Sequence, residues 1–396
     1  MSLPKSDSIR PLLAIYIVWH PSFEQGESIA KLLYGHFRRD HYKNIAGGVG
    51  LSILYRSTPA PGAKVPLSID FDEAQTTAVI ILSEQHIVND PEWKRYAQKL
   101  ADLAEPKGLG SRVFPVEMDE YGLKIGLKQQ ALRWNNWRSL KPEIKQQRLI
   151  SDLTHQFCLM LRHYLEHMKP PVDNNEELIH YLCKVKVFLS HSKHDKDGER
   201  IARAIRDHIH EKHNLESFFD VYNIPPGLPF DRVLLSKVGV SAFIAIYTDS
   251  YSSREWCRKE VIEAKRCRVP LVVANCINNL DERNFPYMGN VPVARMNPKP
   301  IKEERIDFVI GCLFDEVLKD YLWRCRIKPV KGEPGVAFLS RPPELISLVG
   351  LNNSGGTRTN LIVYPDPPLG AEEERLFEEL APGIRLRSML EWQAGR

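Results

Sequence analysis

The chain has no long run of apolar residues. The run at residues 12–19 is far shorter than the roughly 20 residues that a membrane-spanning helix needs, and no other run approaches that length. The pattern of a cleaved signal peptide is also missing. We therefore expect no membrane segment and a cytoplasmic location.

The chain also lacks strong charge of either sign and closely spaced cysteine pairs. It has 54 basic and 50 acidic residues, a formal net charge of +4, and no basic run interleaved with aromatic residues. This balance argues against a protein that binds nucleic acid directly. The seven cysteines include no C-x-x-C pair, so reduced thiols in the cytoplasm are the expected state.

What the chain does contain is a regular alternation of strand and helix patterns. In the middle of the chain, apolar segments rich in β-branched residues alternate with helical stripes such as Ile201, Ile205 and Ile209. The strands predicted for this part lie at 185–190, 217–221, 242–247 and 270–274, and a closing helix lies at 305–323. This alternation predicts a parallel α/β sheet.

The first part of the chain repeats the same order of elements. Its predicted strands lie at 14–19, 51–55, 78–82 and 113–116, and its closing helix lies at 148–166. We interpret this part as a diverged copy of the second. A smaller β-α-β tail follows, with strands predicted at 360–364 and 383–387 and a helix that begins near Ala371.

One predicted helix of the second part carries two kinds of residue. Apolar Cys257, Val261 and Ala264 recur at helical spacing, while Trp256, Glu260 and Glu263 fall on another face. Ser252 or Ser253 is expected to be its N-cap. An aromatic side chain one turn from a carboxylate, just after a strand, can bind a flat ring while the carboxylate acts on the sugar attached to that ring. A surface helix with solvated glutamates is the alternative.

The repeat offers an internal comparison at this position. Glu260 stands four residues beyond Trp256, whereas Ala97 stands four residues beyond Trp93. If the two tryptophans correspond, the first copy lacks the carboxylate.

Four short motifs follow one another in the second part of the chain. They are Phe188-Leu189-Ser190-His191-Ser192 with Asp195, Phe219-Asp220, Ile224-Pro225-Pro226-Gly227, and Ser253-Arg254-Glu255-Trp256-Cys257-Arg258-Lys259-Glu260. In this order and spacing they resemble a Toll/interleukin-1 receptor (TIR) domain over residues 181–325. The resemblance implies tandem flavodoxin-like parallel sheets, with a degenerate TIR-like domain at 9–170 and a linker and small tail at 326–396.

The resemblance also implies an activity and its residues. Many TIR domains resemble NAD glycohydrolases or cyclases, and the glutamate of their W-x-x-x-E motif corresponds to Glu260, which is expected to be catalytic. The expected substrate-binding residues are Trp256, Ser190, His191, Phe219, Ile224, Pro225 and Gly227. Ser190 and His191 also stand at the end of a predicted strand, where open α/β sheets bind ligands.

NAD is thus expected as the substrate, with no cofactor. No metal site is predicted, because the histidine pairs at 191/194 and 210/213 match no H-E-x-x-H motif and have no evident third ligand. Hydrolysis and cyclisation remain open as outcomes. The resemblance further implies self-association, an unidentified activating partner and a role in bacterial antiviral or stress defence. The alternative is a non-enzymatic TIR scaffold for protein–protein signalling.

Overall fold

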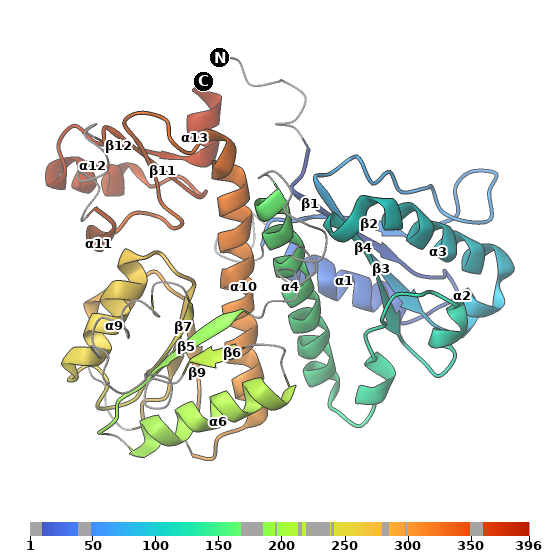
Figure 1. Ribbon diagram of the computed structural model, residues 1–396, viewed down its shortest axis with the longest axis horizontal. Coiled ribbons are helices and arrows are strands. Elements are labelled where there is room, and N and C mark those ends of the chain that lie inside the picture. The colour runs from blue at the N-terminus through green and yellow to red at the C-terminus, as the bar shows by residue number, and fades with distance from the viewer. Residues whose placement is uncertain are drawn as a thin grey trace. The chain divides into compact units, whose positions relative to one another are not determined.

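The computed structural model describes residues 10–38, 49–167, 185–194, 196–212, 216–218, 238, 241–278, 285–297, 299–348 and 359–395 (Figure 1). The chain divides into two compact units, Met1–Leu182 and Cys183–Arg396. Each unit is built around a parallel β-sheet, and the tail belongs to the second unit.

The first unit contains a four-stranded parallel sheet in the order β2-β1-β3-β4. Every residue of the two central strands, β1 and β3, is buried, because helices cover both faces of the sheet. The strands are β1 (Leu13–Val18), β2 (Ser52–Arg56), β3 (Thr76–Ser83) and β4 (Ser111–Glu117). An isolated parallel β-bridge joins Val116 of β4 to Leu132, at the position that a fifth strand would have in the sheet.

Apolar contacts place the helices of this unit on the two faces of its sheet. Helix α3 packs on one face through Trp93, Ala97 and Leu100, whereas Phe157 of α4 meets Phe37 of α1 and Phe114 of β4 on the other. The α-helices are α1 (Gly26–Phe37), α2 (Gln85–Asn89), α3 (Pro91–Ala104) and α4 (Pro142–His167). The short 3-10 helices are η1 (Glu105–Gly110), η2 (Gly122–Ile125) and η3 (Trp134–Trp137).

The second unit contains a five-stranded parallel sheet in the order β6-β5-β7-β8-β9. This is the 2-1-3-4-5 order of flavodoxin-like folds, in which ligands bind beyond the carboxyl ends of the strands. The strands are β5 (Lys186–Ser190), β6 (Glu216–Phe218), β7 (Ala242–Tyr247), β8 (Leu271–Asn275) and β9 (Val293–Arg295).

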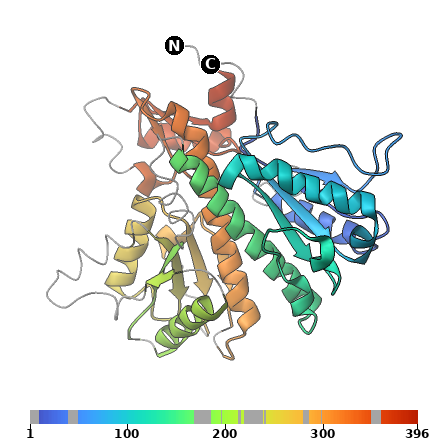
Figure 2. The same ribbon diagram turned by 45° about the vertical axis from the view of Figure 1, so that its right-hand side comes forward.

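Helices also cover both faces of the second sheet. Helix α9 packs on one face through Cys257, Val261 and Ala264. Figure 2 shows α10 (orange) along the sheet on the side away from α9 (yellow), where α10 contacts β7, β8, β9 and α6. These elements are α6 (Lys196–Lys212), α9 (Glu255–Arg266), the 3-10 helix η4 (Pro286–Met288) and α10 (Glu303–Ile327).

The tail forms a third small sheet with the parallel order β10-β11-β12. It packs on the end of α10 through a cluster that includes Trp323, Phe338 and Trp392. Its elements are η5 (Lys328–Val330), β10 (Val336–Phe338), α11 (Leu345–Leu348), β11 (Leu361–Tyr364), α12 (Ala371–Leu380), β12 (Arg385–Ser388) and α13 (Met389–Ala394).

Polar contacts also join the tail to α9. Lys265 Nζ of α9 lies 2.7 and 2.8 Å from the two carboxylate oxygens of Glu344 and donates to the carbonyl oxygen of Gly289 at 2.6 Å. Arg268, just after α9, donates to the carbonyl oxygen of Phe338 at 2.7 Å. The tail and α9 are therefore parts of one packed structure.

The predicted α/β class with parallel sheets is confirmed. Strand β7 has the predicted bounds, and the remaining predicted strands that the structure describes lie within a few residues of their positions. Strand β9 and helix α13, both short, are not predicted from the sequence. The boundaries predicted at 9–170, 181–325 and 326–396 remain predictions.

Candidate functional site

The carboxyl end of the second sheet brings three side chains together. Ser190 is the last residue of β5, and Glu260 lies in the second turn of α9. Tyr251 lies between them in the chain, in the turn that joins β7 to α9. That turn is held by backbone hydrogen bonds from Tyr251 N to Thr248 O at 3.0 Å and from Arg254 N to Tyr251 O at 3.1 Å.

The three side chains form a continuous line of hydrogen bonds. Ser190 Oγ donates to Glu260 Oε2 at 2.5 Å, and the Tyr251 hydroxyl lies 2.5 Å from the same Ser190 Oγ. A hydrogen bond to an ionised carboxylate is shorter and stronger than one between neutral groups. The arrangement therefore orients the Glu260 carboxylate from the sheet side.

All three side chains are buried, although Glu is a residue that usually faces solvent. Glu260 is 5% exposed, and Ser190 and Tyr251 are more deeply buried. Burial raises the pKa of Tyr251 well above its ordinary value, and the nearby Cys257 and Glu260 add to this effect. Tyr251 is consequently a neutral hydroxyl at physiological pH.

The loop after β5 is tightly packed beside this cluster. Cys257 Sγ lies 3.6 Å from the carbonyl oxygen of His191, and Ser250 Oγ donates to Ser192 Oγ at 2.9 Å. A Cβ atom added to Gly198, in the first turn of α6, would lie 3.0 Å from the carbonyl oxygen of Ser192. Glycine at this position lets α6 approach the end of β5 closely.

Trp256 lies one helical turn before Glu260 but differs from it in exposure. Its side chain is 41% exposed, and Lys259 Nζ lies 4.8 Å from the centre of its ring. Lys259 also pairs with Glu255 at 2.7 Å. Glu263, which the sequence analysis placed on the same face, pairs with Arg266. The predicted face therefore combines the buried Glu260 with the exposed Trp256 and the partly buried Glu263.

The remaining predicted site residues divide into two groups. Ser190 and His191 lie at the carboxyl end of β5, as expected, and both are buried. Phe219, Ile224, Pro225 and Gly227 lie outside the described residues, as does Asp195 of the first motif. No sequence pattern indicates a role for Tyr251, because its distance of nine residues from Glu260 follows no helical spacing that would predict the contact.

The predicted serine cap of α9 is wrong. The helix begins at Glu255, and its N-cap is Arg254, whose side chain makes no capping hydrogen bond. Ser253 instead donates to the carbonyl oxygen of Ser250 at 2.7 Å, and Ser252 Oγ lies 3.4 Å from the Tyr247 hydroxyl. These local hydrogen bonds compete with capping.

The described part of the chain also lacks the features of a metal site and of a membrane span. Among the described residues, no group of three His, Cys, Asp or Glu side chains is arranged to hold a metal ion. In the same part of the chain, no helix is both long and apolar enough to cross a membrane. No disulfide joins any of the six described cysteines.

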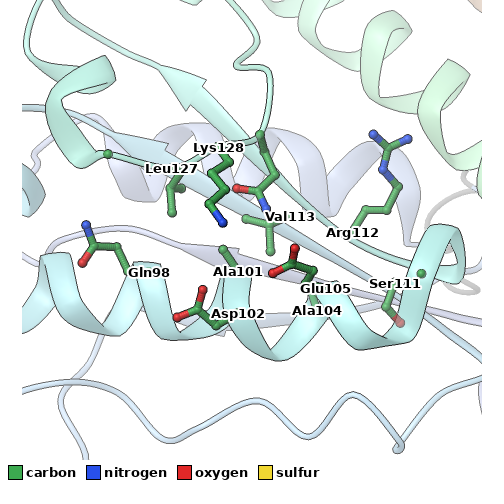
Figure 3. A pocket seen from close by; sticks show the side chains of 13 residues that line it. Gln98, Ala101, Asp102, Ala104, Glu105, Ser111, Arg112, Val113, Leu127 and Lys128 are labelled. Carbon is green, nitrogen blue, oxygen red and sulfur yellow. The ribbon is translucent and has the colours of Figure 1, made fainter.

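A separate cavity of about 390 Å³ lies in the first unit, between α3, η1, the start of β4 and residues 126–129 (Figure 3). Its charged lining residues are Asp102, Glu105, Arg112 and Lys128. It lies near the amino end of β4, whereas ligands of such sheets bind at the carboxyl ends. None of the site residues predicted from the sequence lines it.

Comparison with known proteins bears on the second unit. The family model described as "TIR domain" matches residues 187–294, a range that extends from β5 to β9. Residues 187–294 are a TIR domain. The matched range includes Ser190, Tyr251, Trp256 and Glu260, so the buried hydrogen-bonded cluster belongs to the TIR domain. A search of curated proteins found no match for the chain.

Proposed function

We propose that the TIR domain of this chain is an NAD glycohydrolase in which Glu260 is the catalytic residue. The observation that carries the proposal is the buried Glu260 carboxylate, held by Ser190 at the carboxyl end of the sheet. A buried carboxylate costs free energy even when it is hydrogen-bonded, so a functional use accounts for its presence. TIR domains include NAD-cleaving enzymes, and Trp256 and Glu260 match their W-x-x-x-E motif.

In the proposed reaction, the bond between the ribose carbon and the nicotinamide nitrogen breaks. Its electron pair goes to the nitrogen, so the cationic pyridinium leaves as neutral nicotinamide without needing a proton. Positive charge develops on the ribose, as in other glycoside cleavages. The Glu260 carboxylate stabilises this charge.

Water then adds to the ribose carbon and releases a proton, which gives ADP-ribose. Attack by an adenine nitrogen on the same carbon would give a cyclic product instead. In this scheme the ring of Trp256, which is 41% exposed, stacks on a flat ring of the nucleotide. No cofactor takes part in this scheme, and NAD is the substrate.

We further propose that activity depends on self-association, which is common among TIR domains. In this proposal the first unit is a TIR-like interaction domain, because its sheet has the same order in its first four strands. The proposed setting is bacterial antiviral or stress defence in the cytoplasm, with an activating partner that remains to be identified. The lack of disulfides among the described cysteines is consistent with a reducing compartment.

The test is nicotinamide release from NAD by the purified full-length chain, followed by chromatography over a range of protein concentrations. Release should increase more steeply than protein concentration. Glu260→Gln should lower the rate by at least about 100-fold, because the amide keeps the size of the side chain and an acceptor for Ser190 but loses the charge. Far-UV circular dichroism should show that this variant is folded.

Glu263→Gln is the matched control, because Glu263 lies on the same helix and pairs with Arg266 away from Ser190. Its rate should remain within about twofold of wild type. Equal rates for Glu260→Gln and wild type would exclude the proposed role of Glu260. Absence of release at every concentration would favour the alternative, a TIR scaffold.

A further inference from the structure

Tyr251 is a fully buried tyrosine that the proposed reaction does not use. Its hydroxyl lies at the end of the hydrogen-bonded line that leads through Ser190 to Glu260. Burial keeps the hydroxyl protonated, because it raises the pKa of Tyr251 well above the ordinary value. Tyr251 therefore has a proton to donate over the whole physiological range of pH.

The direction of the hydrogen bonds follows from counting protons. Ser190 carries one hydroxyl proton, and a carboxylate can only accept. The hydrogen bond to Glu260 Oε2 uses the Ser190 proton, so the contact between Tyr251 and Ser190 requires Tyr251 to donate. The order of donation is thus from Tyr251 to Ser190 and from Ser190 to Glu260.

We propose that Tyr251 is a positioning residue for Glu260 that acts through Ser190. This inference rests on the proposed NAD glycohydrolase function. A serine hydroxyl rotates freely unless its surroundings fix it. The Tyr251 hydroxyl donates to Ser190 Oγ, so the serine proton points toward Glu260. The resulting hydrogen bond holds the Glu260 carboxylate in one orientation before substrate binds.

The same core contains a matched control residue. Tyr247 is also buried, and its ring meets that of Tyr251 edge to face at 5.8 Å. Its hydroxyl, however, lies 3.4 Å from Ser252 Oγ. Tyr247→Phe and Tyr251→Phe each remove one hydroxyl from the same apolar cluster, so a general effect on packing should appear in both variants.

The experiment measures kcat and KM for NAD in the full-length protein. Tyr251→Phe should lower kcat about tenfold, the value of one well-placed hydrogen bond, and leave KM within about twofold. Tyr247→Phe should leave both within about twofold. Equal kcat values for the two phenylalanine variants, with the wild type active, would overturn the positioning role and leave the proposed function intact.

Dependence on Ser190 is tested by combining substitutions. Ser190→Ala should lower kcat at least as much as Tyr251→Phe, and the double variant should match Ser190→Ala alone, since Tyr251 acts only through Ser190. If the two losses of kcat instead multiply in the double variant, Tyr251 does not act through Ser190. If Tyr251→Phe fails to fold, Tyr251→Leu, which also removes the hydroxyl and keeps an apolar side chain in the core, carries the same test. A wild type inactive at every concentration would instead overturn the proposed function, and the positioning role with it.

Discussion

The two large sheets share a strand order but differ in the helix that precedes their fourth strand. In the first unit, Trp93 of α3 is only 2% exposed, and Ala97 lies beside it in the apolar core. In the second unit, Trp256 of α9 is exposed, while Glu260 is buried and bonded to Ser190. One helix therefore buries its aromatic residue, and the other buries its carboxylate.

The carboxyl end of the first sheet shows what replaces the polar cluster. The His20 ring lies 5.0 Å from the Trp93 ring and 5.7 Å from the His86 ring. Glu84 is buried, but it caps α2 by accepting from the backbone nitrogens of His86 and Ile87. The carboxylate at this edge thus stabilises a helix end, whereas Glu260 accepts a hydrogen bond from the Ser190 hydroxyl of a neighbouring strand.

The largest expected effect separates the two tryptophans. Trp93→Ala should lower the free energy of unfolding of the first unit by about 3 to 5 kcal/mol, because it empties a large site in the core. Trp256→Ala should lower the free energy of unfolding by only about 1 kcal/mol, because 41% of this residue is exposed. Chemical denaturation of both variants measures the difference. Equal losses of stability would show that Trp256 is a core residue like Trp93.

The next effect concerns how the C-terminal ends of α9 and α3 are held. The end of α9 makes a buried ion pair through Lys265, whereas the end of α3 packs through apolar residues. The Lys265 side chain is 1% exposed and pairs with Glu344. Glu344→Gln should destabilise the second unit by about 2 to 3 kcal/mol, because it leaves a buried ammonium without its carboxylate. Glu372→Gln in the exposed pair with Arg375 should have no measurable effect.

The effect of Glu344→Gln should also depend on pH. Burial lowers the pKa of Lys265 from 10.5, while the hydrogen bond and charge of Glu344 oppose that shift. Removing Glu344 therefore lowers the folded-state pKa further, and the folded state binds Lys265's proton less readily than the unfolded state does. The stability difference between variant and wild type should be largest near neutral pH and should shrink as pH rises through the two folded-state pKa values of Lys265, both of which lie below 10.5. A difference independent of pH would contradict the ion-pair explanation.

The smallest effect concerns Tyr16, a buried tyrosine of the first unit. Tyr16 of β1 donates to Glu73 Oε2 at 2.9 Å, and burial, with that hydrogen bond, raises the pKa of Tyr16 to about 12. Tyr16→Phe should cost about 1 kcal/mol near neutral pH. Because the folded pKa lies above the unfolded value of 10.0, this stabilisation is complete below pH 10 and is lost as pH rises toward 12.

Urea denaturation of wild type and Tyr16→Phe at several pH values checks this behaviour. The two stability curves should converge between pH 10 and about 12. Parallel curves over that range would mean that the Tyr16 hydroxyl is not held as the structure has it.

The extent to which the sequence predicted the structure depends on the kind of interaction. Strand β7 was predicted with its observed bounds because its six apolar residues are buried on both faces, which makes the pattern strong. Strand β9 has three residues, two of them exposed, and offers no such pattern. The W-x-x-x-E motif identifies Glu260, whereas its hydrogen-bond partner Ser190 is 70 residues away in the chain, where no local pattern indicates the contact.

Tyr251 and the α9 cap show a second limit of sequence reasoning. The contact of Tyr251 with Ser190 depends on how the turn after β7 folds, and no periodic spacing describes a turn. The serines before α9 are typical N-cap residues, but their hydroxyls bond elsewhere in the turn, and the helix begins later. Both errors arise where local polar side chains have several competing partners.

The most direct test of the account is the rate of nicotinamide release by wild type and Glu260→Gln, measured side by side at the highest protein concentration. The account predicts release by the wild type and its loss in the variant, with both proteins folded. Equal release by the two proteins would contradict the assignment of Glu260, and no release by the wild type would contradict the proposed activity itself.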